Sequence, residues 1–263
     1  LCDSAATVEG SYDSPVAWAI ADDDNACGYV VGRHFRGVTN RPSPQWVQDR
    51  LRAIGLRPIS ALVDVTNYVS IDLGRPLHVF DAGKLKSDTL TMRRARDGED
   101  FMALVEREYT LDGEMTVIGD GDKAEAVAGV MGGLDTSCTE ETTDVFLEVA
   151  LFDPVSVATT GRKLAIDSDA RYRFERGVDP ESANWGAEVA TRMILEFCGG
   201  ETSGHVTAGA MPDWQHNIEL RTNRVATLGG VDIPAARQAE ILDGLGFETE
   251  TNADVITAAV PPW

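Results

Sequence analysis

The sequence predicts an α+β protein: a domain built on mixed and antiparallel sheets with flanking helices, followed by a small α+β domain. Three observations lead to this class. Two segments have apolar residues at helical spacing, β-branched runs fill the chain between them, and regular strand–helix alternation is absent. A chain of 263 residues, 43% of them hydrophobic, is long enough to bury one large core.

The first part of the chain is expected to be mainly strands and turns. Residues 1–16 are small and polar, which predicts a linker or frayed terminus. From residue 17, AWAIADDDNACGYVVGRHFRGV predicts two short strands around an aspartate-rich turn. β-branched runs predict four further strands, at residues 61–69, 88–94, 115–119 and 144–152.

Two helices have clear ends in the sequence. SPQWVQDRLRAIG begins with Ser43 as N-cap and Pro44 at the first helical position, and Gly55 ends it. The second runs from about 181 to 198 and stops at a pair of glycines.

The pattern changes near residue 217, where a strand, a short helix and a longer helix begun by Pro234 follow. We therefore expect domains at 17–217 and 218–263. The second is short for an independent core, and we expect it to be incomplete at its C-terminus.

Charge and composition exclude several classes of protein. A net charge of −20 argues against nonspecific coating of nucleic acid, so any contact with RNA must be local. The arginines at 93–96 and 171–176 are more typical of a solvated face than of a phosphate site. No bilayer-spanning run and no signal peptide is recognised, so we expect a soluble cytoplasmic protein with no membrane partner and no DNA partner.

Histidine and cysteine spacing predicts neither a metal site nor disulfides. The four cysteines form no C-x-x-C pair, and the four histidines lack the spacing of known ligand motifs. We expect reduced thiols. The sequence also contains neither a phosphate-binding loop nor a G-x-S-x-G nucleophile motif.

Glu148 is the polar exception in TDVFLEVALF, residues 143–152. Both faces of this strand are otherwise apolar, which predicts burial on both sides. A carboxylate there is costly unless it is paired, and it is therefore a candidate functional group. The alternative is a strand end where Glu148 reaches solvent or an arginine.

Three other segments carry polar groups or glycines in apolar surroundings. Asp64 and Thr66 are expected to share one face of an apolar strand, and His78 in GRPLHVFD is either a packed core residue or part of a site. The glycines of AVAGVMGG, residues 126–133, either form a tight turn or let a ligand approach the backbone.

Four motifs in order, SPQWVQDRLRAIGLRPISALVDVTNYVSIDLGRPLHVFD, AGVMGG, FLEVALFDP and RYRFERGVDP, resemble the central editing module of bacterial phenylalanyl-tRNA synthetase β subunits. The resemblance covers residues 17–210, and residues 218–263 resemble most of the small domain that follows. It implies hydrolysis of tyrosine wrongly esterified to phenylalanine tRNA, with the α subunit as partner in a heterotetramer. No cofactor is implied for editing; ATP and magnesium serve only the complete synthetase, and this chain alone would not activate phenylalanine.

The same resemblance implies the residues of an editing pocket. His78, Thr66 and Gly132 would serve catalysis, whereas substrate would be bound by Arg57, Glu148, Ser168 and Ala170. Glu148 would accept the tyrosine hydroxyl. Position 168 is commonly threonine in the family, and serine keeps the hydroxyl while leaving a wider pocket.

The implied mechanism is attack by an ordered water, positioned by His78 and the terminal ribose hydroxyl, with backbone N–H near Gly132 stabilising the oxyanion. Whether His78 is a general base or only orients the water stays open. The alternative function is a noncatalytic tRNA-docking or scaffold piece of the synthetase; a free-standing editing factor is disfavoured by the segment after residue 217.

Overall fold

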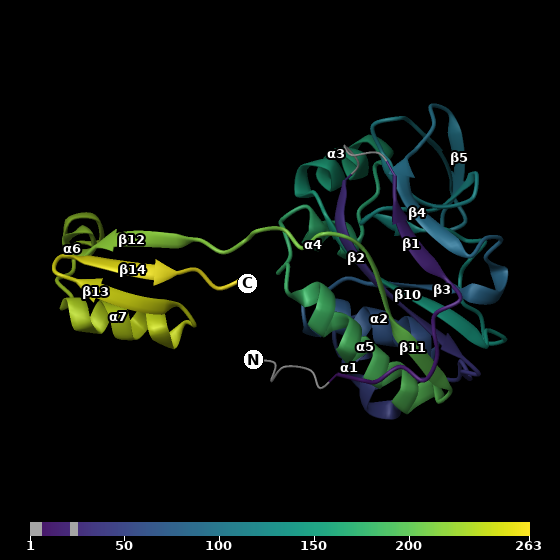
Figure 1. Cartoon of the computed structure of the whole chain (residues 1–263), viewed down its shortest axis with the longest axis horizontal. Coiled ribbons are helices and arrows are strands. Elements are labelled where there is room, and N and C mark those ends of the chain that lie inside the picture. Colours follow the sequence, from purple (N-terminus) through teal and green to yellow (C-terminus); the bar gives the residue numbers. More distant parts are fainter. Residues whose placement is uncertain (1–6, 22–25) are drawn as a thin grey trace. The chain divides into compact units, whose positions relative to one another are not determined.

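The computed structural model describes residues 7–21 and 26–263, which form two compact units (Figure 1). The first ends at Met211 and the second runs from Pro212 to Trp263. This division lies a few residues before the boundary expected near 217, because residues 212–216 form an irregular stretch that leads into the first strand of the second unit. Both units combine helices with sheets, which confirms the α+β class.

Two main sheets build the first unit. One is mixed, in the order β1-β4-β7-β8-β9, with β1 parallel to β4 and all other pairs antiparallel. Its strands are β1 (Ala17–Ile20), β4 (Thr89–Arg94), β7 (Thr116–Asp120), β8 (Lys123–Val127) and β9 (Met131–Gly132). The other is antiparallel, in the order β11-β2-β10-β3, and is formed by β2 (Cys27–Arg36), β3 (His78–Asp81), β10 (Asp144–Phe152) and β11 (Glu201–Gly209).

Helices cover one face of the antiparallel sheet, and the mixed sheet covers the other (Figure 1). The covering helices are α1 (Gln45–Ala53), α2 (Ala61–Asp72) and α5 (Ser182–Cys198). Smaller elements complete the unit: η1 (Ala82–Lys84), α3 (Pro154–Leu164), α4 (Asp169–Phe174), and a hairpin of β5 (Glu99–Met102) with β6 (Glu108–Leu111).

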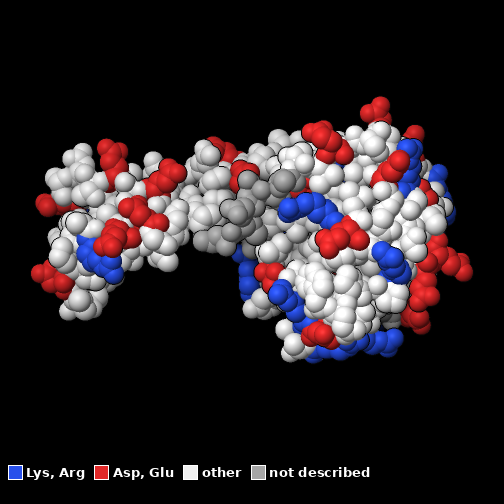
Figure 2. Space-filling view, turned by 90° about the horizontal axis from the view of Figure 1, so that it is seen from below, with Lys and Arg blue, Asp and Glu red and all other residues white. Residues whose placement is uncertain are grey.

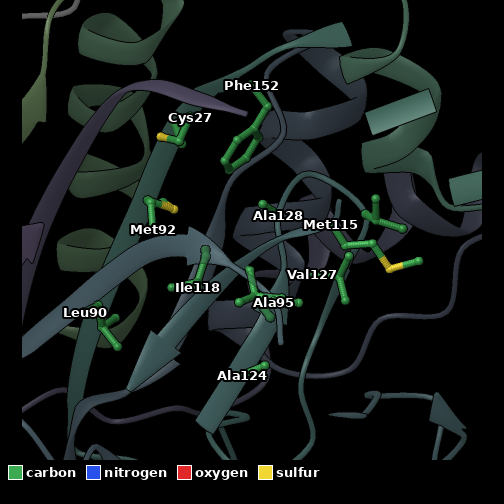
Figure 3. Packing of buried hydrophobic residues seen from close by; sticks show 14 of the residues in the cluster. Cys27, Leu90, Met92, Ala95, Met115, Ile118, Ala124, Val127, Ala128 and Phe152 are labelled. Atoms are coloured by element: carbon green, nitrogen blue, oxygen red, sulfur yellow. The ribbon is translucent and has the colours of Figure 1, made fainter. Parts of the chain in front are cut away.

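β10 separates two hydrophobic cores, as its sequence predicts. Its odd-numbered side chains from Val145 to Leu151 pack against the helices. Phe146, Ala150 and Phe152 point the other way, into the core shared with the mixed sheet, part of which Figure 3 shows. The prediction of a strand buried on both faces is confirmed, since every residue of β10 after Asp144 is buried.

The expected strand at residues 61–69 is wrong, because this segment is the helix α2. Leu62, Val65 and Val69 are buried and recur three and four residues apart, a helical period that the β-branched composition obscured. Asp64 and Thr66 therefore do not share a face, since residues two apart in a helix lie on nearly opposite sides.

Asp64 fixes the start of α2. Its side chain is 1% exposed, and its two carboxylate oxygens accept hydrogen bonds from the Ser43 hydroxyl at 2.5 Å and from the Ile59 N–H at 2.8 Å. Ser43 is consequently not an N-cap of α1: that helix begins at Gln45, and Pro44 occupies its cap position. The short α1 is tied to α2 through this buried carboxylate.

Residues 7–16, the described part of the segment expected as a linker or frayed terminus, contact the body of the first unit. The Val8 N–H donates to the Glu188 carboxylate at 2.9 Å, and the Arg33 guanidinium donates to the Val8 carbonyl at 2.5 Å. Tyr12 contacts the His34 side chain at 2.9 Å. The first six residues and the aspartate-rich turn at 22–25 lie outside the described residues.

The second unit is a three-stranded antiparallel sheet in the order β12-β14-β13 with two helices. Its elements are β12 (Asn217–Arg221), α6 (Asn223–Gly229), α7 (Ala235–Gly244), β13 (Glu248–Asn252) and β14 (Val255–Ala259). The strand, short helix and longer helix predicted from the sequence are all present. Its buried side chains are few, among them Gln238, Ile256 and Ala258.

Candidate functional site

A cavity of about 470 Å³ opens in the first unit where α2, β3, the β8–β9 turn and the start of α4 meet. One face of α2 forms a wall, because residues three, four and seven apart point the same way; the α2 residues that line the cavity are Val63, Thr66, Asn67, Ser70 and Ile71. The remaining walls are mostly apolar, with Leu104, Ile118 and Met131 among them.

Six of the seven residues predicted for a site line this cavity: Thr66, His78, Gly132, Glu148, Ser168 and Ala170. They come from five separate segments, spread over about a hundred residues of sequence. Arg57, the seventh, is not brought to them. Its side chain is exposed in the connection between α1 and α2, and it does not line the cavity.

Glu148 is the buried acid of the cavity. It is 5% exposed on β10, between Phe146 and Ala150 on the same face, and one carboxylate oxygen, Oε1, is buried without a hydrogen-bond partner. Burial raises the pKa of Glu148 to about 7, and the Arg75 guanidinium and the Ala150 N–H act in the opposite direction. The alternative that Glu148 reaches solvent is therefore wrong.

His78 lies directly opposite Glu148 in the antiparallel ladder between β3 and β10. Opposed residues of such a pair have Cβ atoms about 5 Å apart on the same face. The imidazole packs edge-on against Phe80, with ring centroids 4.6 Å apart, and its Nε2 is buried without a hydrogen-bond partner. Burial lowers the pKa of His78 to about 4, so the ring is neutral at pH 7.

Gly132 leaves room for the imidazole. A Cβ atom at this position would lie 2.5 Å from His78 Cε1 and 3.0 Å from His78 Nε2, closer than real side chains approach. The Gly133 N–H donates to the Glu125 carbonyl of β8 at 2.8 Å. Residue pairs of an antiparallel ladder are alternately hydrogen-bonded and non-hydrogen-bonded, so the next pair, Ala126 and Gly132, is a non-hydrogen-bonded pair. The Gly132 N–H therefore points away from β8, on the same side as the Gly132 carbonyl.

The two hydroxyls of the predicted site already have partners. Thr66 donates to the Val63 carbonyl of its own helix at 2.8 Å. Ser168 caps α4 by accepting from the Arg171 N–H at 3.1 Å, and it donates to the Val130 carbonyl at 2.6 Å. Ser168 thus joins α4 to the β8–β9 turn and fixes the shape of the wall. In that turn Gly129 has a φ of +69°, so the segment forms a tight turn. Gly132, three residues later, allows the close approach of the His78 imidazole to the backbone.

Arg75 is the charged group near this site that sequence reasoning missed. It stands three residues before His78, is 0% exposed, and donates to the Ala150 carbonyl and, at 3.4 Å, to the Ser182 hydroxyl. Its guanidinium carbon lies 5.6 Å from the ring centre of Phe174. An arginine beside a proline in a turn-like segment is more often exposed, so nothing in the local sequence pointed to its burial.

The arginine clusters noted in the sequence pair with nearby acids. Arg93 binds Glu99 at 2.6 Å and Arg171 binds Glu175 at 3.0 Å. Acidic and basic side chains are interspersed over the face shown in Figure 2. Among the residues described, no three His, Cys, Asp or Glu side chains are grouped closely enough to hold a metal ion. The same residues include no helix that is both long and apolar enough to cross a membrane.

Comparison with known proteins relates the chain to one domain family and to one subunit of one enzyme. Residues 26–199 match the B3/4 domain family. The chain is 52% identical to the phenylalanine–tRNA ligase beta subunit of Rhodospirillum rubrum over 100% of its length, which is 33% of that protein. It is 54% identical to the same subunit of Paramagnetospirillum magneticum and 53% identical to that of Gluconobacter oxydans, over 97% of its length in both cases and over 32% and 31% of those proteins.

One solved structure, an N-terminal fragment of the phenylalanyl-tRNA synthetase beta subunit from Pyrococcus horikoshii, is similar at a TM-score of 0.49 and 14% identity, over 97% of this chain and 72% of that one. That likeness is too distant to add to the assignment. The chain spans about one third of the curated relatives it matches. Because the family match covers most of the first unit, the chain belongs to the B3/4 domain family and resembles, over its whole length, a third of the bacterial phenylalanine–tRNA ligase beta subunit.

Proposed function

We propose that the first unit is an editing domain that hydrolyses tyrosine wrongly esterified to phenylalanine tRNA. The observation that carries this proposal is Glu148, which lines a cavity of about 470 Å³ and whose Oε1 is buried without a hydrogen-bond partner. Such a volume is in the range of small-molecule sites and accommodates an aromatic amino acid. The similarity to phenylalanine–tRNA ligase beta subunits supplies the substrate class.

Physical chemistry explains why a second site is needed. A hydrophobic pocket for phenylalanine rejects the same ring with one added hydroxyl by only about a hundredfold. A site that hydrogen-bonds the hydroxyl discriminates far better, because the analogue without it leaves a buried polar group unpaired. Glu148 meets this requirement: it accepts the phenol O–H of tyrosine and gains no partner from phenylalanine.

Hydrolysis would proceed by direct attack of a water on the ester carbonyl. The bond between the carbonyl carbon and the ribose oxygen breaks, tyrosine leaves as the free acid, and the proton from the water ends on the terminal ribose hydroxyl. His78 Nε2 is buried, has no partner and faces the backbone of β9, where it would hold this water. The Gly132 N–H would donate to the oxyanion.

The pKa of His78 favours orientation of the water over general-base catalysis. At about 4, it keeps the imidazole neutral and able to accept a hydrogen bond at pH 7, but it makes the imidazole a weak base. Ser168 and Ala170 would shape the wall beside the substrate, and Thr66 would contribute the opposite wall. Arg57 would reach the substrate only if the nucleotide extends beyond the cavity, since its side chain lies outside.

The complete synthetase would supply what this chain lacks. The relatives are about three times longer, and their name implies an α subunit and phenylalanine tRNA as partners. Activation of phenylalanine, with its ATP and magnesium, would belong to that complete enzyme. The net charge of −20 predicts weak binding of tRNA by the isolated chain, because phosphate contacts need basic groups.

The deciding experiment incubates the chain with tyrosyl- and phenylalanyl-esterified phenylalanine tRNA and measures the release of each amino acid. We expect selective loss of the tyrosyl ester, and we expect Glu148→Gln to remove the selectivity. Binding of tRNA with no hydrolysis of either ester would favour a noncatalytic docking function instead. Equal hydrolysis of both esters by the native chain would contradict the role of Glu148.

A further inference from the structure

The turn of the β5–β6 hairpin lies at the rim of the cavity. Leu104, in this turn, lines the cavity although its side chain is 39% exposed. Met102 and Val105 are exposed as well, at 37% and 59%, but they do not line the cavity. Single apolar side chains in water are common, whereas a group of them beside a cavity indicates a surface that something covers or uses.

Backbone hydrogen bonds hold this turn against β9 and the residues that follow it. The Leu104 N–H donates to the Gly132 carbonyl at 3.0 Å. Two residues further along, the Leu134 N–H donates to the Met102 carbonyl, also at 3.0 Å. Because the main chain fixes Leu104, replacement of its side chain should leave the turn where it is.

The Leu104 side chain lies beside the imidazole of His78. A Cβ atom at Gly132 would lie 2.9 Å from Leu104 Cδ1 and 2.5 Å from His78 Cε1, so these two atoms are at most the sum of those distances, 5.4 Å, apart. The Gly132 N–H points to the same side of β9 as the carbonyl that binds Leu104. Since Leu104 is itself partly exposed, it stands between solvent and both groups.

We propose that Leu104 is a positioning residue for the hydrolysis: its side chain covers His78 Nε2 and the Gly132 N–H against bulk water, so that one water is held for attack on the ester. This inference rests on the proposed function. The leucine side chain transfers no proton and makes no hydrogen bond, and it acts through His78. A hydrogen bond shielded from bulk water is electrostatically stronger, which keeps the attacking water in place.

The protonation of His78 agrees with such a cover. The residue is half-buried as a whole, but its Nε2 is fully buried, and burial lowers the pKa of His78 to about 4. Exposure of the ring should therefore raise this pKa toward 6.5. The other ionisable side chains around the cavity and on the turn are Glu148, Cys138, Asp167, Asp169, Glu106 and Arg107. None of them is changed by a substitution at Leu104.

The first measurement follows the His78 imidazole by NMR from pH 8 to pH 5, in the whole chain without substrate, with His78→Ala to assign the signal. In Leu104→Ala the pKa of His78 should rise by about one pH unit. Leu104→Met refills the space and should keep the native titration. Val105→Ala, in the same turn but away from the cavity, is the matched control. An unmoved titration in Leu104→Ala, or an equal shift in Val105→Ala, overturns the proposal.

The second measurement compares hydrolysis of tyrosyl- and phenylalanyl-esterified phenylalanine tRNA. In Leu104→Ala, kcat should fall about tenfold for both esters, with KM and the ratio of the two esters close to native, because Glu148 sets that ratio. Leu104→Met should restore kcat. A changed ratio with unchanged kcat overturns the proposal, because Leu104 would then select the amino acid.

Two further outcomes are separable. If Leu104→Ala does not fold, Leu104→Val removes one carbon and should move the His78 titration and kcat in the same directions by a smaller amount; no movement of either overturns the proposal. If the native chain hydrolyses neither ester, the proposed function is overturned, while the His78 titration still decides whether Leu104 covers the imidazole.

Discussion

Replacement of Glu148 by glutamine is expected to stabilise the protein at pH 8 while it removes the proposed preference of the cavity for tyrosine over phenylalanine. Glutamine keeps the shape of the side chain and cannot ionise. Burial raises the pKa of Glu148 from 4.5 to about 7, and a pKa difference of this size corresponds to about 3 kcal/mol of unfolding free energy. The charge is therefore retained at a cost in stability, as is common for functional groups.

The direction of the pH dependence follows from which state binds the proton more tightly. At Glu148 the folded state binds the proton more tightly than the unfolded state. The stability contributed by this group is therefore complete below about pH 4.5 and is lost as the pH rises through about 7. His78 acts in the opposite direction: its pKa is lowered from 6.5 to about 4, so its contribution is present above pH 6.5 and is lost as the pH falls through 4. The free energy of unfolding of the native protein contains both pH dependences. The difference in this free energy between the native protein and Glu148→Gln contains only the contribution of the Glu148 carboxylate.

Urea denaturation followed by tryptophan fluorescence, at pH 5 and at pH 8, measures this difference. We expect the two proteins to differ by under about 1 kcal/mol at pH 5, and the variant to be more stable by roughly 2 to 3 kcal/mol at pH 8. Glu141→Gln, at an exposed position, is the matched control and should show no such change between the two pH values. A variant that is equally or less stable at pH 8 would refute the description of Glu148 as a buried, desolvated carboxylate.

Three other changes test the site and its support. Gly132→Ala should lower tyrosyl ester hydrolysis about tenfold or more, because the new Cβ would lie 2.5 Å from the imidazole of His78, and it should destabilise by about 1–3 kcal/mol in urea denaturation. His78→Ala should lower the hydrolysis rate and preserve its pH profile; loss of the fall in rate at low pH, where the imidazole of the native chain is protonated, would instead show that His78 is a general base. Asp64→Ala should cost about 2–4 kcal/mol of unfolding free energy, because the Ser43 hydroxyl and the Ile59 N–H lose their buried acceptor, and unchanged stability would contradict this.

The sequence predicts those elements whose pattern and burial agree. β10 has apolar residues on both faces and is buried on both, and α5 has helical spacing with glycines at its end. The segment 61–69 shows where such prediction fails. Its β-branched residues favour a strand, but Leu62, Val65 and Val69 pack as one helix face and Asp64 fixes the start of the helix through long-range partners. Those partners lie outside any local window of sequence.

The residues of the candidate site, like the helices and strands, could be predicted only in part from the sequence. Glu148 stands out in the sequence as a lone acid in an apolar strand, and Thr66 and the glycines around Gly132 stand out as polar or small residues in apolar segments, whereas Ser168 and Ala170 are implied only by the family resemblance. The use of the Ser168 hydroxyl as a helix cap and as a donor to Val130 follows from the packing of α4 against the β8–β9 turn. Spacing in the sequence does not contain that information.

Arg75 shows why a buried charge is the hardest part of such a site to predict. The free-energy cost of burying the Arg75 guanidinium depends on its three-dimensional surroundings. These are the Ala150 carbonyl, Ser182 and the space left by Gly186, which lie about 75 to 111 residues away along the chain. Each of these residues is unremarkable alone, and together they hold a cation near Glu148. Glu148 in turn has one buried oxygen without a partner, which costs stability and which the phenol of the proposed substrate would satisfy. In the proposed function the same desolvation would provide the selectivity of the cavity, because only a ligand with a hydroxyl at that point would relieve it.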